Sequence, residues 1–184
     1  SFTLEGMAVL QEADVDALAG RLEPLVKREI LAVNRDPRSP ERGQYRFVQS
    51  IIREIAHQRI SRADRLRRHL KVAQYFESLG DPELNGIVAS HLLDAFEVAS
   101  ESERETLRSA VVGGLLAAAD RAADVQAHDQ VLELCERGLE IVTDAASRGR
   151  LLIKAARSAH AVLDDRADEF ARSALESCRE AGDS

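Results

Sequence analysis

Residues 45–80 constrain the fold of this chain more than any other segment. They read YRFVQSIIREIAHQRISRADRLRRHLKVAQYFESLG. Tyr45 and Phe47 alternate with polar neighbours, and this alternation predicts a short strand with both rings on one face. The isoleucines that follow recur at helical spacing, so we expect a helix over 50–59. The strand therefore leads directly into helical sequence.

A second helix is expected directly after the first. Ser61 is an N-cap residue, and Asp64, three residues later, is its capping-box partner. Gly80 and Pro82 supply the usual signals for a helix end. Together with the strand, this pattern indicates a junction between a small domain and a helical region, not the core of an enzyme.

The sequence before this junction predicts a small mixed domain over residues 1–60. Helices are expected at 4–10 and 14–30, with a kink or a break at Pro24. A strand at 31–33 and a strand at 44–48 flank a polar, proline-containing loop. Two helices, a strand, a loop and a strand give the outline of a winged-helix domain that lacks its usual leading helix. We interpret this domain as truncated at its N-terminus, since the chain also begins at Ser1 without a methionine.

The rest of the chain, 61–184, is expected to be an antiparallel helical array. Its connections are short, and short connections place consecutive helices antiparallel to one another. The fold class is therefore mainly α, with a partial winged helix and its small β-hairpin ahead of the array. After the junction, helices are expected at 83–98, 102–125, 127–142, 147–163 and 166–181.

A weak internal repeat lies within this array. Residues 137–140 (RGLE) and 173–176 (SALE) match at a spacing of 36 residues. A small residue before leucine in the second helix of a pair, recurring at about 34 residues, is typical of tetratricopeptide repeats. The repeat is degenerate, because the chain contains no tryptophan. Tetratricopeptide-like hairpins are our prediction, and a generic helical bundle is the alternative.

Charge divides the chain in the same way. Residues 1–75 hold 14 Lys and Arg against 10 Asp and Glu, whereas residues 76–184 hold 11 against 22. The acidic half disfavours binding of nucleic acid by the whole chain. No apolar run reaches the roughly 18 residues of a membrane span, so we expect a cytoplasmic protein without membrane contact. Cys135 and Cys178 have no metal-type spacing and are expected to be free, buried thiols.

The sequence contains no catalytic motif, so we predict no catalytic, cofactor or metal site in this segment. None of the five histidines belongs to a zinc-type helical pair, and we interpret those beside apolar positions as core or interface residues rather than ligands. The candidate interaction surface is the basic part of the junction with two of these histidines, although a solvated, salt-bridged helix face would give the same pattern. Its members are Arg62, Arg65, Arg67, Arg68, Lys71, His69 and His91.

Several of these residues also carry a resemblance to a known family. Phe2 to Gly6, Leu22 to Leu31, Tyr45 to Ile60 and Ala73 to Leu79 resemble the segment that follows the ATPase module in large bacterial signalling proteins. Those proteins combine a class III adenylate/guanylate cyclase domain, an AAA/STAND ATPase, a winged-helix-like domain and tetratricopeptide repeats. The matching positions are Phe47, Ile51, Arg53, Glu54, Ile55, Ala56, Arg65, His69, Ala73, Ala89 and His91. Gln49 and His57 depart from the family pattern.

The resemblance implies a non-catalytic regulatory and protein-interaction segment. Its expected partners are a protein or peptide and the upstream ATPase module of the same chain, and the parent protein would carry the cyclase activity. An ATPase-linked transcriptional regulator with winged-helix DNA binding shares the same junction and stays open as the alternative. A small-molecule sensor is a third hypothesis. Oligomeric state and effector are not specified by the sequence.

Overall fold

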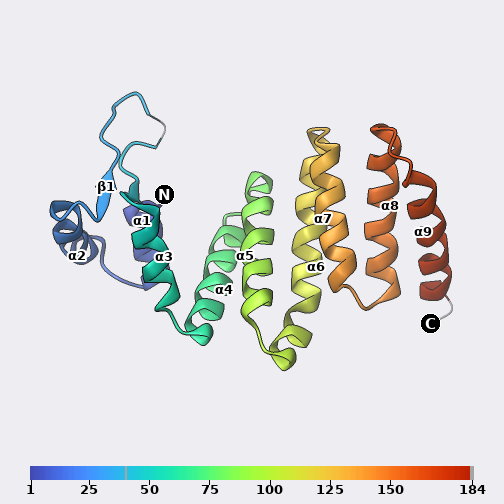
Figure 1. Cartoon of the computed structure of the whole chain (residues 1–184), viewed down its shortest axis with the longest axis horizontal. Helices are drawn as coiled ribbons and strands as arrows, with labels where there is room; N and C mark the ends of the chain where they lie inside the picture. The colour runs from blue at the N-terminus through green and yellow to red at the C-terminus, as the bar shows by residue number, and fades with distance from the viewer. Residues whose placement is uncertain (40, 183–184) are drawn as a thin grey trace. The chain divides into compact units, whose positions relative to one another are not determined.

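The computed structural model describes residues 1–39 and 41–182 and divides the chain into two compact units, Ser1–Asp64 and Arg65–Ser184. Over the described residues the fold is mainly α, with nine α-helices and one two-stranded antiparallel sheet near the N-terminus (Figure 1). The predicted fold class is confirmed at this level. Among the described helices, none combines the length and apolar composition needed to cross a bilayer.

The first unit opens with two capped helices. The helices α1 (Leu4–Gln11) and α2 (Val15–Lys27) follow Thr3 and Asp14, whose side-chain oxygens each accept a backbone N–H from the first turn. Such caps satisfy donors that the helix itself leaves without partners. Of the predicted kink or break at Pro24, the break does not occur, because α2 continues through Pro24 to Lys27. The proline removes one hydrogen bond, to the carbonyl of Gly20, and the helix ends three residues later.

A short hairpin follows α2. The strands β1 (Leu31–Val33) and β2 (Tyr45–Phe47) pair antiparallel, with Leu31 opposite Phe47 and Val33 opposite Tyr45. Phe2 adds an isolated bridge on the other edge of β2, with two backbone hydrogen bonds to Tyr45 and ring centroids 5.6 Å apart. The start of the chain is thereby fixed to the hairpin.

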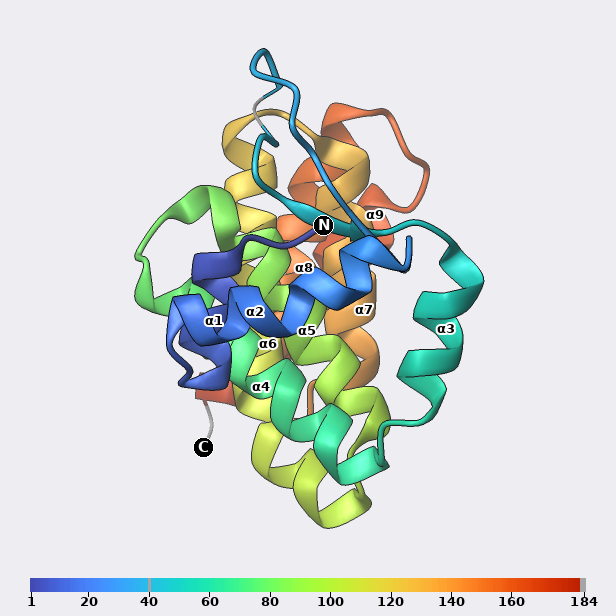
Figure 2. The ribbon, with the colours of Figure 1, turned by 90° about the vertical axis from the view of Figure 1, so that its left-hand side faces the viewer.

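The helix α3 (Ser50–Gln58) leads away from the end of β2 (Figure 2). Its predicted apolar stripe exists in sequence, but Ile51 and Ile55 are about half exposed, at 53% and 48%. None of the residues of α3 is buried. The helix therefore contributes little to the core of the first unit.

The second unit is built from helices that pack in chain order. After α4 (Arg62–Ser78), whose first residues belong to the first unit, Gly80 adopts a φ of 65° and a short 3₁₀ turn, η1 (Pro82–Leu84), follows. The remaining helices stand side by side in alternating directions (Figure 1). They are α5 (Asn85–Val98), α6 (Glu101–Asp124), α7 (His128–Ile141), α8 (Ala145–Ala161) and α9 (Ala167–Gly182).

The core of this unit consists of aliphatic side chains and small residues. Leu115, Leu151, Val111 and Val131 are its largest fully buried side chains other than Cys135. Glycines let neighbouring helices approach closely: a Cβ on Gly114 would meet Leu92 of α5, and one on Gly138 would meet Leu151 of α8. A high proportion of small residues thus lets the helices pack closely around a core that has few aromatic side chains.

Contacts between alternate helices arrange this unit in two layers. The helix α8 packs against α7 and also against α6, and Lys154 of α8 pairs with Asp120 of α6. In the other layer, Arg137 of α7 pairs with Glu97 of α5. The hairpin of α8 and α9 therefore packs, through α8, on both helices of the preceding hairpin of α6 and α7.

Candidate functional site

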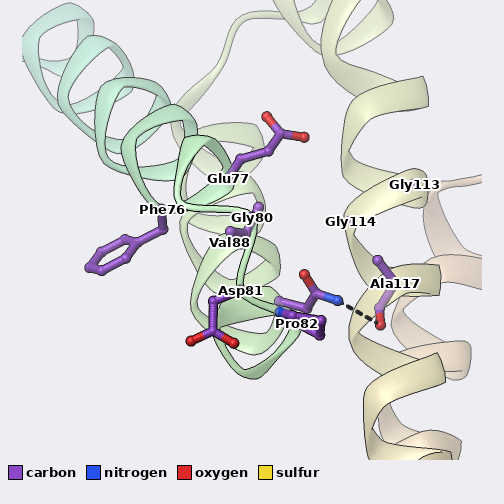
Figure 3. Close-up of a pocket in the computed structure, with 10 residues that line it drawn as sticks. Phe76, Glu77, Gly80, Asp81, Pro82, Val88, Gly113, Gly114 and Ala117 are labelled. Carbon is purple, nitrogen blue, oxygen red and sulfur yellow. Dashed lines mark hydrogen bonds between the residues drawn. The ribbon is translucent and has the colours of Figure 1, made fainter.

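A hollow opens where the turn after α4 approaches α6. It has a volume of about 230 Å³, and α4, η1, α5 and α6 all contribute to its lining. Figure 3 shows the turn at Gly80 and Pro82 facing Gly113, Gly114 and Ala117 of α6, while the ring of Phe76 points away from α6. Gly113 contributes no side chain to the hollow, and a Cβ there would meet no atom within 4 Å.

The lining of this hollow combines apolar walls with acidic groups. Val88 and Ala117 provide apolar surface, and the two carboxylates of the lining belong to Glu77 and Asp81. The side-chain amide of Asn85 donates a hydrogen bond of 3.3 Å to the carbonyl of Ala117, which joins α5 to α6 beside the hollow (Figure 3). The residues described as lining it include no Lys or Arg. The lining thus combines apolar side chains with two acidic residues, of which Asp81 also accepts the Glu83 N–H at 3.0 Å.

A second cluster brings together three polar side chains from α4 and α5. His69 Nδ1 lies 3.1 Å from His91 Nδ1 and 3.4 Å from the Oδ2 of Asp94, which is 3.9 Å from His91 Nδ1. The side chains of His69 and His91 are only 19% and 29% exposed. Burial lowers the pKa of His91, and the carboxylate of Asp94 offsets part of that shift.

Helix packing places these three groups. His91 and Asp94 are three residues apart on α5, and residues at this spacing are neighbours on one helix face. His69 reaches them from α4, which is held by the burial of Leu66 in a small apolar cluster with Ala95 and Ala99. Two imidazole nitrogens and one carboxylate oxygen within 4.8 Å of one another are a set that could hold a metal ion.

The predicted interaction surface does not form one face. On α4, Arg62, Arg65 and His69 follow one another at spacings of three and four residues and share one side of the helix. Arg67, Arg68 and Lys71 lie further round the helix, and Arg67 and Arg68 are exposed. Of the seven predicted residues, the structure brings His69 and His91 into contact, while the basic residues are spread around α4.

Arg65 differs from the other basic residues of this helix. Its side chain is partly buried, and its Nε has no hydrogen-bond partner. It lies one turn before His69 on the same side of α4. At this position, therefore, a basic side chain of the junction points partly toward the protein interior and not only toward solvent.

Asp94 is the member of the cluster that the sequence analysis missed. Its signal is the spacing His91-x-x-Asp94, which places two ligand-type residues on one helix face. That spacing alone is common in helices. It indicates a possible site only because His69 of α4 lies close to both residues. The expectation of two buried cysteines is also partly wrong, because Cys135 is buried and Cys178 is exposed.

The fold and these sites define a mainly α chain in which a small hairpin-bearing unit precedes sequentially packed helices. No protein-family model matches the chain, and no curated protein or solved structure is significantly similar to it.

Proposed function

We propose that this chain is a non-catalytic regulatory and protein-interaction segment of a multidomain bacterial signalling protein, located in the cytoplasm. The observation that carries the proposal is the packing of α8 against both α6 and α7, so that one hairpin stacks on the whole of the preceding hairpin. Arrays that stack in this way expose an extended surface that binds protein partners.

The repeat in the sequence supports a tetratricopeptide-like assignment for this array. Gly138 of α7 and Ala174 of α9, which occupy the matching positions, are both buried. The upstream matches Ala119 and Ala155 are fully buried on α6 and α8. Small residues at equivalent buried positions of two successive hairpins are what a repeat with a conserved packing geometry requires.

The first unit supports a winged-helix-like assignment. Two helices precede a hairpin, and Phe2 pairs with the outer edge of β2. Phe2, which precedes both helices in the chain, thus adds a one-residue bridge beside the two strands of the hairpin. Together with the resemblance of residues 45–60 to the junction after an ATPase module, this favours a regulatory domain beside such a module.

The hollow between the α4–α5 turn and α6 is the proposed contact point for a partner. Its volume of about 230 Å³ is smaller than the roughly 300–1,000 Å³ of typical small-molecule pockets. It has room for one long side chain of a protein or peptide. Because its lining carries Glu77 and Asp81, we propose that a Lys or Arg enters it, with the apolar stem against Val88 and the charged end near the carboxylates.

In the parent protein, this segment would act by binding differently to two states of an upstream ATPase module. A partner that prefers one state shifts the equilibrium between them by its difference in affinity. The cyclase and nucleotide-binding residues would then lie in sequence that precedes Ser1. Under this proposal, the described residues supply binding surfaces and no chemistry.

The direct test measures binding between this chain and the ATPase module that we propose precedes it in the parent protein. We expect no ATP hydrolysis and no cyclic AMP formation by the chain alone, and measurable binding to the module by calorimetry. Gly113→Leu should fill the hollow and weaken that binding, whereas Gly86→Leu, an equally open helical position outside the lining, should not. ATP turnover by the chain, or equal binding by both variants and the parent sequence, would contradict the proposal.

The second candidate function is DNA binding by an ATPase-linked transcriptional regulator. The observation that favours it is a group of exposed arginines, Arg35, Arg38 and Arg42, in the loop between β1 and β2. It predicts salt-dependent binding to duplex DNA that weakens when these residues, or Arg65, Arg67 and Arg68, are changed to Glu. Absence of binding at low salt would remove this alternative.

A further inference from the structure

The three side chains of the α4–α5 cluster lie at distances that suit a common metal ion. Their ligand atoms are separated by 3.1, 3.4 and 3.9 Å. A point equidistant from all three lies about 2.0 Å from each, close to the roughly 2.0–2.2 Å of zinc–nitrogen and zinc–oxygen bonds. This point lies in the plane of the three atoms, and an ion slightly out of that plane, as a tetrahedral site requires, stays within bonding distance of all three.

A hydrogen bond between the two imidazoles explains only part of this geometry. One neutral ring can donate from Nδ1 to the lone pair of the other, which accounts for the 3.1 Å separation. The carboxylate oxygen of Asp94 lies within 4 Å of both nitrogens, and an ion pair with a protonated imidazole is the metal-free arrangement that a metal titration must distinguish from a metal site. A cation that takes the lone pairs of all three atoms uses the whole arrangement.

The ligand types select the class of metal. Two imidazole nitrogens and one carboxylate oxygen suit Zn²⁺ and its first-row neighbours, whereas Mg²⁺ and Ca²⁺ prefer oxygen ligands throughout. We propose that His69, His91 and Asp94 form a binding site for Zn²⁺ or a related divalent transition metal. Three protein ligands leave a fourth position of a tetrahedral site for water or for a group from a partner.

A metal ion in this site would link two helices of the array. His69 belongs to α4, whereas His91 and Asp94 belong to α5. A bound ion would tie these helices together beside the apolar cluster of Leu66, Ala95 and Ala99, which is much smaller than the main core. Metal binding therefore stabilises the attachment of α4, the first helix of the array, at its most thinly packed contact.

The test begins with metal-free, untagged protein titrated with Co²⁺ and Zn²⁺. We expect one Co²⁺ per chain with the visible absorption of a low-coordinate site, displacement by Zn²⁺, and a higher melting temperature with Zn²⁺. His69→Gln, His91→Gln and Asp94→Asn should each weaken Zn²⁺ binding at least about tenfold, as loss of a ligand does more than loss of a supporting contact.

Two control variants separate this site from adventitious surface binding. His160→Gln removes an exposed histidine on α8, and Cys178→Ser removes the exposed thiol on α9, so neither should change the affinity. Absence of a cobalt spectrum from the parent protein would overturn the proposal even if a variant failed to fold. Binding that the control variants weaken as much as the three ligand variants would overturn it as well.

Discussion

Gly138 of α7 lies against Leu151 of α8 with no room for a methyl group between them. A Cβ on Gly138 would come within 2.8 Å of Leu151 Cδ2 and 2.9 Å of its Cδ1. Leu151 is fully buried, so its side chain is closely confined by its neighbours. This contact sets the distance between two hairpins of the array.

Gly138→Ala should therefore destabilise the protein although alanine is the better helix former. We expect a loss of about 1–3 kcal/mol, the usual effect of an added methyl group in a packed core. Urea denaturation monitored by circular dichroism measures the change. An unchanged midpoint would mean that α7 and α8 can separate without loss, which would contradict the packing described above.

The matched substitution at Gly113 should have the opposite sign. Its Cβ would meet no atom within 4 Å, and the position is exposed in the middle of α6. Gly113→Ala should stabilise the protein by about 0.5–1 kcal/mol, because alanine loses less backbone freedom in a helix. A destabilising effect in the same denaturation experiment would show that α6 needs a glycine here for another reason.

The sequence predicted the helices well because the signals that end them are local. Just before α4, the Ser61 hydroxyl accepts the Asp64 N–H at 3.1 Å. Just after α4, Gly80 has the positive φ that is typical of a helix end. Each of these residues acts on neighbours a few positions away, so its role is visible in the sequence. The start of α8 was predicted two residues late because the cap is Asp144 rather than a later residue.

The contacts between helices could not be predicted in the same way. The approach of His69 to His91 depends on how α4 and α5 pack, and their separation of 22 residues carries no motif. The pairing of Phe2 with Tyr45 is likewise non-local. Cys178 was expected to be buried because free thiols usually are, but cysteine spacing does not specify which neighbours cover a helix.

Asp144 should make a pH-dependent contribution to stability. Its carboxylate accepts the Ser147 N–H at 2.7 Å, and this bond lowers its pKa from the ordinary 3.8. A lowered folded-state pKa means that the stabilisation is present above the unfolded value and is lost as the pH falls through the folded one. Asp144→Ala should cost about 1 kcal/mol at neutral pH.

Denaturation of both proteins across the acidic range measures this effect. The difference between the parent protein and Asp144→Ala should narrow as the pH falls below about 3.8, because the parent loses its charged cap. Asp144→Asn serves as the control, since asparagine caps a helix without titrating in this range. A difference between parent and alanine variant that stays constant with pH would contradict the role of the ionised cap.

The two cysteines should differ strongly in reactivity. Burial raises the pKa of the Cys135 thiol to about 11, whereas Cys178 is exposed on α9. The thiolate is the reactive form of cysteine. A disulfide reagent at neutral pH should therefore label Cys178 rapidly and leave Cys135 unmodified until the protein unfolds. Mass spectrometry of the labelled peptides identifies the site. Equal labelling rates, or fast labelling in Cys178→Ser, would contradict the burial of Cys135.

The ion pair between Glu97 of α5 and Arg137 of α7 should contribute little to the stability of the array. Its atoms lie 3.2 Å apart, but the side chains are 63% and 47% exposed. Water and salt screen such pairs, so we expect a coupling energy of about 0.2–1 kcal/mol. A double-mutant cycle with Glu97→Gln and Arg137→Gln, measured by denaturation in low and high salt, gives this value directly. A coupling energy of several kcal/mol that does not change with salt would contradict this prediction. The ion pair, and not only the close packing at Gly138, would then stabilise the arrangement of the helices.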